Sequence, residues 1–416
     1  MRPALHFTPR EGWINDPHGI TYRDGRYHVF FQYVPGQTRW GPNCHWGHAV
    51  GPDLLSLTEL PVAIAPGDGD DGIWTGCLVT DHDRRARIFY TSITTPDFGL
   101  GRVRVATPTG PDWLDWNKGD VVVDAPEGLD LIAYRDPFIR KERDGWRMFV
   151  GTAMRDGTAA ALTYTSDDLD SWHYAGVALQ RSTAETDPVW MGALWECPQV
   201  FAIGDRAVMV SSVWDDDVLH YAGYALGSYT DGVFHAEAWG RLTYGDSYYA
   251  PSLFLDADDR PCLLFWMRGI RDEAAGWAGA HSVPYLLSLD GDRLVARVHP
   301  DLEAHRAGVA PKGEVDGEAA DIAWSDGLGG ELTIASDDET VVLRWDAGAL
   351  VVRCASSAPD APAVRVPVEG AVRVVVDGPV LEVSSAAGLL GVPTAPFVTP
   401  LRIGATRGAL QVHALS

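Results

Sequence analysis

The strongest constraint on the fold is a unit that recurs five times in the first 290 residues. Each copy begins with a polar Asp-Gly or Asp-Arg turn and continues into an apolar run. The copies are DGRYHVFFQY from Asp24, DRRARIFYTS from Asp83, DGWRMFVGTA from Asp144, DRAVMVSSVW from Asp205 and DDRPCLLFWM from Asp258. Subtracting the start positions gives spacings of 59, 61, 61 and 53 residues. Such turns between two apolar runs are typical of β-hairpins.

A spacing of about 60 residues is too long for one hairpin and suits a four-stranded sheet with generous loops. The repeat therefore predicts an all-β protein with a five-bladed β-propeller, and the 44 glycines and 27 prolines fit many strands joined by turns. A sandwich of unrelated hairpins is the weaker alternative, because the spacing is even.

The pattern changes after about residue 330. There the chain alternates between apolar and polar residues with period 2, broken by Gly, Asp and Pro, which is typical of an antiparallel β-sandwich. We expect a propeller domain over residues 1–295, a linker over 296–310 and a sandwich over 311–416.

The repeat also defines equivalent positions upstream of each turn. Asp16 lies eight residues before the first turn, and the residues eight or nine positions before the later turns are Thr75, Asp136, Glu196 and Tyr249. The innermost strand of each propeller blade lines the central channel. We therefore expect these five positions to converge at one end of the axis, where three of them are carboxylates.

Paired carboxylates around one pocket are what glycoside cleavage needs, because one attacks the anomeric carbon and the other protonates the leaving oxygen. Asp16 lies in an Asn-Asp-Pro turn and is expected to be solvated and ionised. Glu196 lies in Trp-Glu-Cys-Pro, an apolar setting that suits a general acid. We expect Arg135 to keep its neighbour Asp136 charged and able to accept hydrogen bonds from sugar hydroxyls.

Aromatic and amide side chains occur near the same positions. Flat rings suit the C–H faces of sugars and amides supply directional hydrogen bonds; the candidates are Trp13, Trp40, Trp74, Trp195, Gln32 and Asn15. Each motif alone is a weak signal. Together, in register with the repeat, they favour a sugar-cleaving pocket.

Composition excludes several partners. The chain has 33 Lys and Arg against 57 Asp and Glu, a net charge of −24. Nucleic acid and anionic membranes select basic patches, so neither is expected as a partner. The five cysteines contain no C-x-x-C pair, so neither a disulfide framework nor a zinc site is expected. With no apolar signal-peptide run at its start, the protein is expected in the cytoplasm.

The quoted motifs resemble those of one enzyme family. WINDPHG, RDPF and WECPQ, together with FFQY, WGPNCHWGHA and WTGC, are similar to the motifs of glycoside hydrolase family 32, the β-fructofuranosidases. The resemblance runs through most of the chain. The late run VRVVVDGPVLEV is similar to the family's sandwich signature, with Asp377 and Glu382 on its acidic positions.

This resemblance implies a retaining double displacement that releases terminal β-D-fructofuranosyl units from sucrose or short fructans. It implies that Asp16 is the nucleophile, Glu196 the general acid/base, and Asp136 the carboxylate that holds the fructose C3 and C4 hydroxyls. The other positions that match the family's fructose pocket are Asn15, Gln32, Trp40, Trp74, Thr75 and Arg135. It implies no metal and no organic cofactor.

Several alternatives remain open. A fructosyltransferase would use the same intermediate with a sugar hydroxyl as acceptor, and a fructan-specific exo-inulinase or levanase would differ only in substrate. An inverting propeller glycosidase would also use three axial carboxylates. A non-catalytic fructan-binding protein is disfavoured because all three carboxylates are present. The sequence does not determine the oligomeric state.

Two departures from the family pattern concern the leaving group. Tyr248 replaces a Phe and is expected near the pocket rim, and Tyr285 stands where the family has an Arg. Because phosphate binding uses Arg or Lys, the loss of this Arg gives no support for phosphorylated sucrose as the substrate. His18, His45 and His48 could still contribute to such a site, so the sequence does not determine whether phosphorylated sucrose is used.

Overall fold

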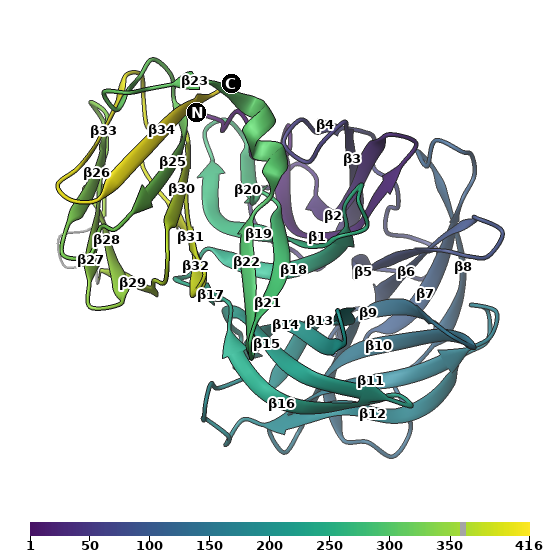
Figure 1. The fold of residues 1–416 in the computed structure, drawn as a ribbon. Coiled ribbons are helices and arrows are strands. Elements are labelled where there is room, and N and C mark those ends of the chain that lie inside the picture. Colours follow the sequence, from purple (N-terminus) through teal and green to yellow (C-terminus); the bar gives the residue numbers. More distant parts are fainter. Residues whose placement is uncertain (358–362) are drawn as a thin grey trace.

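The computed structural model describes residues 1–357 and 363–416. Within these residues nearly all regular structure is β-strand, with a single 3-10 helix, so the predicted all-β class is confirmed (Figure 1). The same described residues contain no helix with the length and apolar character needed to span a bilayer.

Three separate antiparallel sheets of four strands each follow the repeat. The first contains β5 (Gly72–Thr80), β6 (Ala86–Ile93), β7 (Arg102–Pro108) and β8 (Trp116–Val123). The second contains β9 (Leu131–Glu142), β10 (Gly145–Met154), β11 (Thr158–Ser166) and β12 (His173–Ser182). The third contains β13 (Leu194–Ile203), β14 (Arg206–Asp215), β15 (Val218–Thr230) and β16 (Val233–Arg241). In each, the predicted Asp turn joins the first two strands.

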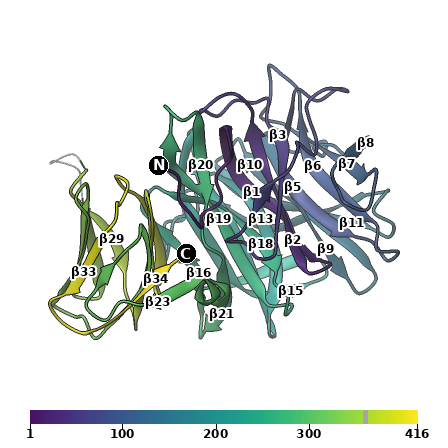
Figure 2. The ribbon, with the colours of Figure 1, turned by 90° about the horizontal axis from the view of Figure 1, so that it is seen from above.

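A nine-stranded sheet brings together both ends of the first 300 residues. Its early strands are β1 (Gly12–Arg23), β2 (Arg26–Val34), β3 (His45–Gly51) and β4 (Thr58–Glu59). Its late strands are β18 (Tyr248–Leu255), β19 (Pro261–Asp272), β20 (Trp277–His281), β21 (Tyr285–Asp290) and β22 (Arg293–Val298). The two groups meet where β1 pairs in parallel with β20, and Figure 2 shows these strands side by side.

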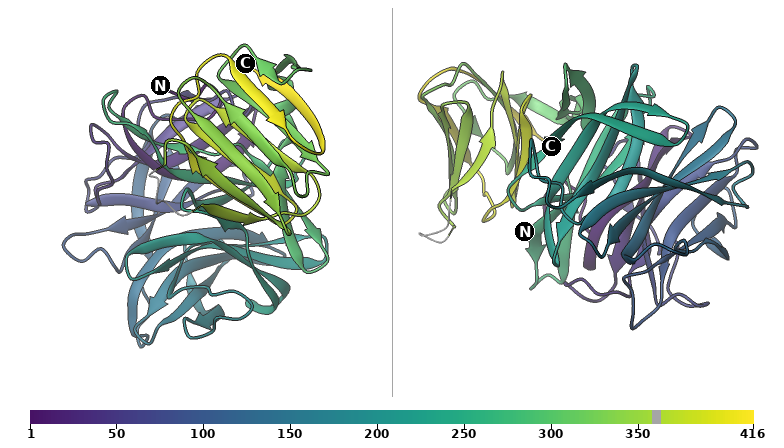
Figure 3. Two further views of the ribbon diagram at one scale, coloured as in Figure 1. Left: turned by 90° about the vertical axis from the view of Figure 1, so that its left-hand side faces the viewer. Right: turned by 90° about the horizontal axis from the view of Figure 1, so that it is seen from below.

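Two further sheets form the C-terminal part. The seven-stranded sheet contains β17 (Thr243–Tyr244), β32 (Gly388–Pro393), β31 (Val380–Ser385), β30 (Val372–Asp377), β25 (Ala319–Ser325), β34 (Ala409–Leu415) and β23 (Arg306–Val309). The six-stranded sheet contains β24 (Glu314–Val315), β33 (Leu401–Ala405), β26 (Glu331–Ala335), β27 (Thr340–Asp346), β28 (Ala349–Cys354) and β29 (Val364–Pro367). The sheets lie face to face (Figure 3) and share one apolar core. The 3-10 helix η1 (Pro300–His305) precedes β23, within the stretch expected as a linker.

The first strand of each repeat is interrupted by a β-bulge at an equivalent place. The ladder shifts register at Ile14/Pro17 in β1, Trp74/Gly76 in β5, Arg135/Phe138 in β9, Glu196/Gln199 in β13 and Tyr249/Ser252 in β18. Bulges bend a strand and re-aim its side chains, and they are frequent beside active sites. The bulges therefore fall where the candidate carboxylates lie.

The local sequence explains these bulges. Four of them contain a proline, which has no N–H for a ladder and is tolerated in a sheet at bulges and edges; they are Pro17, Pro137, Pro198 and Pro251. In β5 the position is Gly76, where a Cβ would lie 1.9 Å from the carbonyl oxygen of Phe89. Asp136, Cys197 and Ala250 take positive φ angles of 64°, 50° and 47°. Such backbone strain is characteristic of functional sites.

A buried polar cluster ties the amino-terminal segment to the C-terminal sheets. The backbone N–H groups of Ala4, Leu5 and His6 donate to the Asp377 carboxylate at 2.7, 2.8 and 3.0 Å. The His6 ring lies between two carboxylates, with Nδ1 2.8 Å from Asp377 and Nε2 2.5 Å from Glu382. Burial opposes the charged imidazolium, but the hydrogen bonds to the two carboxylates raise the pKa of His6 to about 9. The cluster is therefore ionic.

The same cluster corrects the expectation about Tyr248 and Tyr285. Both hydroxyls donate to the Glu382 carboxylate, from Tyr285 at 2.6 Å, and Val283 N donates to it at 2.7 Å. Both rings are buried between the nine-stranded sheet and the C-terminal sheets. The prediction that Tyr248 lies at the pocket rim is therefore wrong. Because Tyr285 is buried away from the pocket, the identity of this residue gives no information about the leaving group.

Candidate active site

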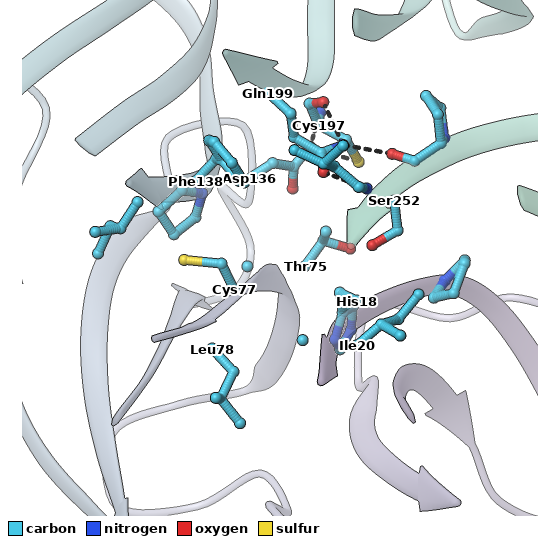
Figure 4. Close-up of a pocket in the computed structure, with 17 residues that line it drawn as sticks. His18, Ile20, Thr75, Cys77, Leu78, Asp136, Phe138, Cys197, Gln199 and Ser252 are labelled. Atoms are coloured by element: carbon cyan, nitrogen blue, oxygen red, sulfur yellow. Dashed lines mark hydrogen bonds between the residues drawn. The ribbon is translucent and has the colours of Figure 1, made fainter. Parts of the chain in front are cut away.

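Residues of the five bulged strands line one shared cavity, called here the central cavity. This small cavity has a volume of about 60 Å³. Figure 4 shows its labelled lining residues, among them His18 of β1, Thr75 and Cys77 of β5, Asp136 of β9, Cys197 of β13 and Ser252 of β18. The equivalent segments of the repeat therefore converge as the sequence predicts.

A larger cavity of about 700 Å³ shares Asp136 with the central cavity. Its size is typical of small-molecule sites. Eight of the nine predicted site residues line it: Asn15, Asp16, Gln32, Trp40, Trp74, Arg135, Asp136 and Glu196. The ninth, Thr75, lines the central cavity and contacts Asp16.

Asp16 is held by three donors. Its carboxylate accepts hydrogen bonds from Thr75 Oγ1 at 2.6 Å, Asn15 Nδ2 at 3.0 Å and Gln32 Nε2 at 3.3 Å. The residue is only 9% exposed, so the expectation of a solvated carboxylate is wrong. Burial and the nearby charge of Glu196 raise the pKa of Asp16 to about 6, while the bonds from Thr75 and Asn15 oppose that rise. Asp16 is therefore mostly ionised at pH 7.

Asp136 occupies the bulge of β9. Its Oδ2 accepts a hydrogen bond from Cys197 N at 2.9 Å, and its own N–H donates to Thr91 Oγ1 at 2.8 Å. These bonds join β9 to β13 and β6. Burial, followed by the charge of Glu196, raises the pKa of Asp136, and the opposing effect of Arg135 is smaller.

Glu196 is the carboxylate that Arg135 contacts. Arg135 Nε donates to Glu196 Oε1 at 2.9 Å, and the Tyr249 hydroxyl donates to Oε2 at 2.5 Å. Burial and the Glu196 charge hold the pKa of Tyr249 well above its usual value, so its hydroxyl remains a donor. The expectation that Arg135 keeps Asp136 charged is therefore wrong, because Arg135 donates to Glu196 and its effect on the Asp136 pKa is outweighed by burial and the Glu196 charge. Both oxygens of Glu196 have fixed partners.

A thiol lies between the two buried aspartates. Cys197 Sγ is 3.8 Å from Asp16 Oδ2 and 3.7 Å from Asp136 Oδ2. Burial and the surrounding carboxylates hold the pKa of this thiol well above its usual value, so it is a neutral weak donor. No sequence motif assigns Cys197 to the site; only its position next to Glu196 indicates it.

Several residues that line the larger cavity have no role predicted from the sequence. Tyr249 is in register with the carboxylates, but the sequence predicts no role for it. The remaining unassigned lining residues are Phe98, Gly99, Ile132, Ala133, Trp214, Asp217, Leu219, Trp266 and Arg268. Most lie in loops or strands outside the repeated positions, where no periodic signal marks them.

One cluster of side chains outside the two cavities has the residue types that bind metal ions. Ligand atoms of Asp256, Cys262 and His299 lie within 4.8 Å of one another. Arg260 Nε donates to Asp256 at 2.7 Å, and His299 Nε2 lies 2.9 Å from the same carboxylate oxygen. Because a guanidinium already neutralises Asp256, this group is an ion-pair cluster rather than a site suited to a cation.

Comparison with known proteins agrees with this geometry. Residues 6–298 match the family model described as "Glycosyl hydrolases family 32 N-terminal domain". The chain belongs to glycoside hydrolase family 32. The matched region of this family 32 chain contains all nine predicted site residues and both cavities.

Two curated proteins illustrate the relationship within family 32. The chain is 31% identical to a sucrose-6-phosphate hydrolase of Zymomonas mobilis over 325 residues, which covers 73% of this chain and 63% of that protein. It is 30% identical to a raffinose invertase of Escherichia coli, with 74% and 67% covered. The chain thus spans somewhat less than two thirds of the Zymomonas protein.

Solved family 32 structures share the fold. A Bombyx mori β-fructofuranosidase, determined as a mutant with sucrose, aligns with a TM-score of 0.83 at 24% identity, over 100% of this chain and 93% of that one. Fructan 1-exohydrolase IIa from Cichorium intybus aligns with a TM-score of 0.82 at 20% identity, over 100% and 97%. Both alignments extend over the C-terminal sheets as well as residues 6–298.

Proposed function

We propose that the protein is a retaining glycoside hydrolase that releases terminal β-D-fructofuranosyl units from sucrose or short fructans. The observation that carries the proposal is that one cavity contains two carboxylates in different environments. Asp16 is buried among neutral donors, whereas Glu196 is held by Arg135 and Tyr249. Pairs of carboxyl groups in different environments are typical of the nucleophile and the acid of a glycosidase.

The proposed reaction proceeds in two steps. A carboxylate oxygen of Asp16 forms a bond to the anomeric carbon C2, the bond from C2 to the leaving oxygen breaks, and Glu196 gives that oxygen a proton. Glu196 then removes a proton from water, whose oxygen attacks C2 and releases fructose and Asp16. Arg135 and Tyr249 would orient Glu196 in both steps. Asp136 would hold sugar hydroxyls through hydrogen bonds.

We further propose that residues 1–295 form a five-bladed β-propeller, followed by a linker over 296–310 and a β-sandwich over 311–416. The blades would be β1–β4, β5–β8, β9–β12, β13–β16 and β18–β22. Support comes from the five bulged strands around one cavity, from the parallel pairing of β1 with β20, and from the similarity to family 32 structures. In a propeller, residues from all blades reach one end of the axis.

Product analysis on sucrose, inulin and levan tests the proposed activity. We expect free fructose to be released from chain ends, with β-fructofuranose as the first product seen by NMR, because double displacement retains configuration. Trisaccharides as the main product from concentrated sucrose would instead identify a fructosyltransferase. First appearance of the α-anomer would identify an inverting enzyme, and no fructose from any of the three would contradict the proposal.

The pKa of Asp16 predicts the acid side of the pH profile. Because the nucleophile must be ionised, we expect kcat/KM to fall as the pH drops through about 6. Thr75→Val removes the hydroxyl that favours the ionised carboxylate, so this acid limb should move to higher pH by about one unit. Initial rates on sucrose between pH 4 and pH 8 measure both effects.

A matched variant controls for the loss of a buried hydroxyl. Thr163 is also buried, and its hydroxyl has no hydrogen-bond partner among the described residues. Thr163→Val should therefore leave the acid limb where it is. An unchanged limb in Thr75→Val would contradict the assignment of that limb to Asp16.

A further inference from the structure

Among the described residues, the larger cavity is lined by two guanidinium groups, and one of them has no assigned role. Arg135 donates to Glu196. Arg268 in β19 has no carboxylate partner within the same described residues, and its Nη1 and Nη2 donate instead to the carbonyl oxygens of Leu219 and His220, at 2.8 and 3.2 Å. Burial lowers the pKa of Arg268. Burying a cation without an ion pair costs free energy, so another interaction must offset the cost.

A bulge in β19 directs the Arg268 side chain. The ladder between β19 and β20 shifts register between Met267 and Arg271, and Gly269 inside this bulge has a φ of 84°. The backbone of Arg268 bonds instead to Ser247: Arg268 N donates to Ser247 O at 2.8 Å, and Ser247 Oγ donates to Arg268 O at 3.0 Å. Bulges re-aim side chains beside active sites. Arg268 is thereby fixed beside the start of β18.

The Arg268 guanidinium lies over the face of the Tyr249 ring. Its central carbon is 5.1 Å from the centroid of that ring, within the range of a cation–π interaction. Trp266 contacts the same ring edge to face, with centroids 6.4 Å apart. Two side chains of β19 therefore hold the Tyr249 ring, and the attraction to the ring offsets part of the cost of burying the Arg268 charge.

The Tyr249 hydroxyl connects this contact to the group that we propose as the acid/base. It donates to Glu196 Oε2 at 2.5 Å, while Arg135 donates to Oε1. A cation on the face of a phenol ring polarises the ring and strengthens the hydroxyl as a donor. A ring that cannot tilt also keeps the hydroxyl, and with it the Glu196 carboxyl group, in one position.

We infer that Arg268 is a positioning residue, which holds Tyr249 and through the Tyr249 hydroxyl keeps Glu196 aimed at the leaving oxygen. This inference rests on the proposed fructosidase activity, in which Glu196 protonates that oxygen. Loss of Arg268 should therefore slow the release of those leaving groups that need a proton, and no others.

The test compares leaving groups that differ in their need for a proton. Sucrose and methyl β-D-fructofuranoside release alcohols, which need the proton, whereas β-D-fructofuranosyl fluoride releases fluoride, which does not. The measured quantity is kcat/KM, which reports the steps up to formation of the fructosyl-enzyme. We expect Arg268→Met to lower it about tenfold on sucrose and the methyl fructoside, and less than about twofold on the fluoride. Arg268→Lys keeps a cation at the ring and should lose less than about threefold on each.

A double-mutant cycle tests whether Arg268 acts through Tyr249. Tyr249→Phe keeps the ring but removes the hydroxyl that donates to Glu196. Adding Arg268→Met to Tyr249→Phe should therefore change kcat/KM on sucrose less than about twofold, because the connection is already broken. A further tenfold loss would show that Arg268 acts by another route and would overturn the inference.

Arg241→Met is the matched control. The Arg241 guanidinium also lies over tyrosine rings, 4.0 Å from the centroid of Tyr221 and 4.5 Å from that of Tyr244. Its Nε likewise donates to a backbone carbonyl oxygen, that of Thr243, at 2.7 Å. Arg241 lies outside the larger cavity, so Arg241→Met should leave the rates on all three substrates unchanged.

Three results for Arg268→Met would overturn the inference while the fructosidase activity stands. A loss on sucrose alone would show that Arg268 contacts the leaving sugar, equal losses on all three substrates would show a general effect on the pocket, and no loss would show no role. Arg268→Gln carries the same test if Arg268→Met does not fold. A wild type that cleaves none of the three substrates would overturn the proposed function and this inference with it.

Discussion

Asp16→Asn is expected to lower kcat on sucrose by roughly 10⁴- to 10⁶-fold, the range seen when a catalytic nucleophile is removed. The amide keeps the shape of the side chain but cannot form the covalent bond to C2. The two donors nearest to Asp16, Thr75 and Asn15, remain in place, and Gln32 can still approach. The measurement is the initial rate of fructose release by purified variant and wild type.

Folding must be shown to be intact for this result to be informative. A circular dichroism spectrum and a thermal unfolding curve of Asp16→Asn should match those of the wild type. Asp144→Asn makes the same chemical change at an exposed turn and should keep full activity. If Asp16→Asn retained more than a small fraction of wild-type turnover, the nucleophile would have to be another group.

Asp377→Ala is expected to destabilise the protein by about 3–5 kcal/mol, because it leaves the buried His6 imidazolium without one of its two carboxylates. It also removes the acceptor of three backbone N–H groups at residues 4–6. The shift of the urea unfolding midpoint measures the loss. Asp338→Ala, at an exposed position of the same C-terminal part, should shift it little.

The cluster also predicts how stability depends on pH. The pKa of His6 is about 9 in the folded protein and about 6.5 when unfolded, so its contribution is fully present below pH 6.5 and is lost as the pH rises through 9. Burial disfavours the ionised Asp377, but the bond to His6 brings its pKa below the usual value, so its contribution is lost only in acid. His6→Ala should therefore flatten the fall in melting temperature between pH 7 and pH 9.5. An unchanged slope would contradict the charged imidazolium.

The convergence of the site could be predicted because the repeat fixes which residues are equivalent. Residues as far apart as Asp16 and Tyr249 share one cavity, and counting back from the Asp turns was sufficient to group them. The wide spacing of the turns also predicted four-stranded sheets, three of which appear as separate units. A register that repeats five times gives more information about which residues converge than any single motif does.

The partners of individual side chains could not be predicted in the same way. The repeat predicts on which strand a residue lies, but the bulge in β9 interrupts the alternation of side chains and brings the neighbours Arg135 and Asp136 to the same cavity. Their partners there, Glu196 for Arg135 and Cys197 N for Asp136, come from another strand. The burial of Asp16 and the burial of Tyr285 depend on packing between segments that are distant in the sequence. A repeated Pro or Gly after the equivalent residues was the signal that could have indicated the bulges.

The parallel pairing of β1 with β20 affects how the protein is made. Gly12 pairs with Trp277, so the ribosome must add 265 more residues before the second partner of this strand exists. At typical synthesis rates of about 5–20 residues per second, this delay is on the order of 10 to 50 seconds. Throughout that time the strand bearing Asp16 has one hydrogen-bonding edge unfilled, and its neighbour His6 has no carboxylates to join. The strand β1 is thus synthesised long before its partner β20 and reaches its final contacts late.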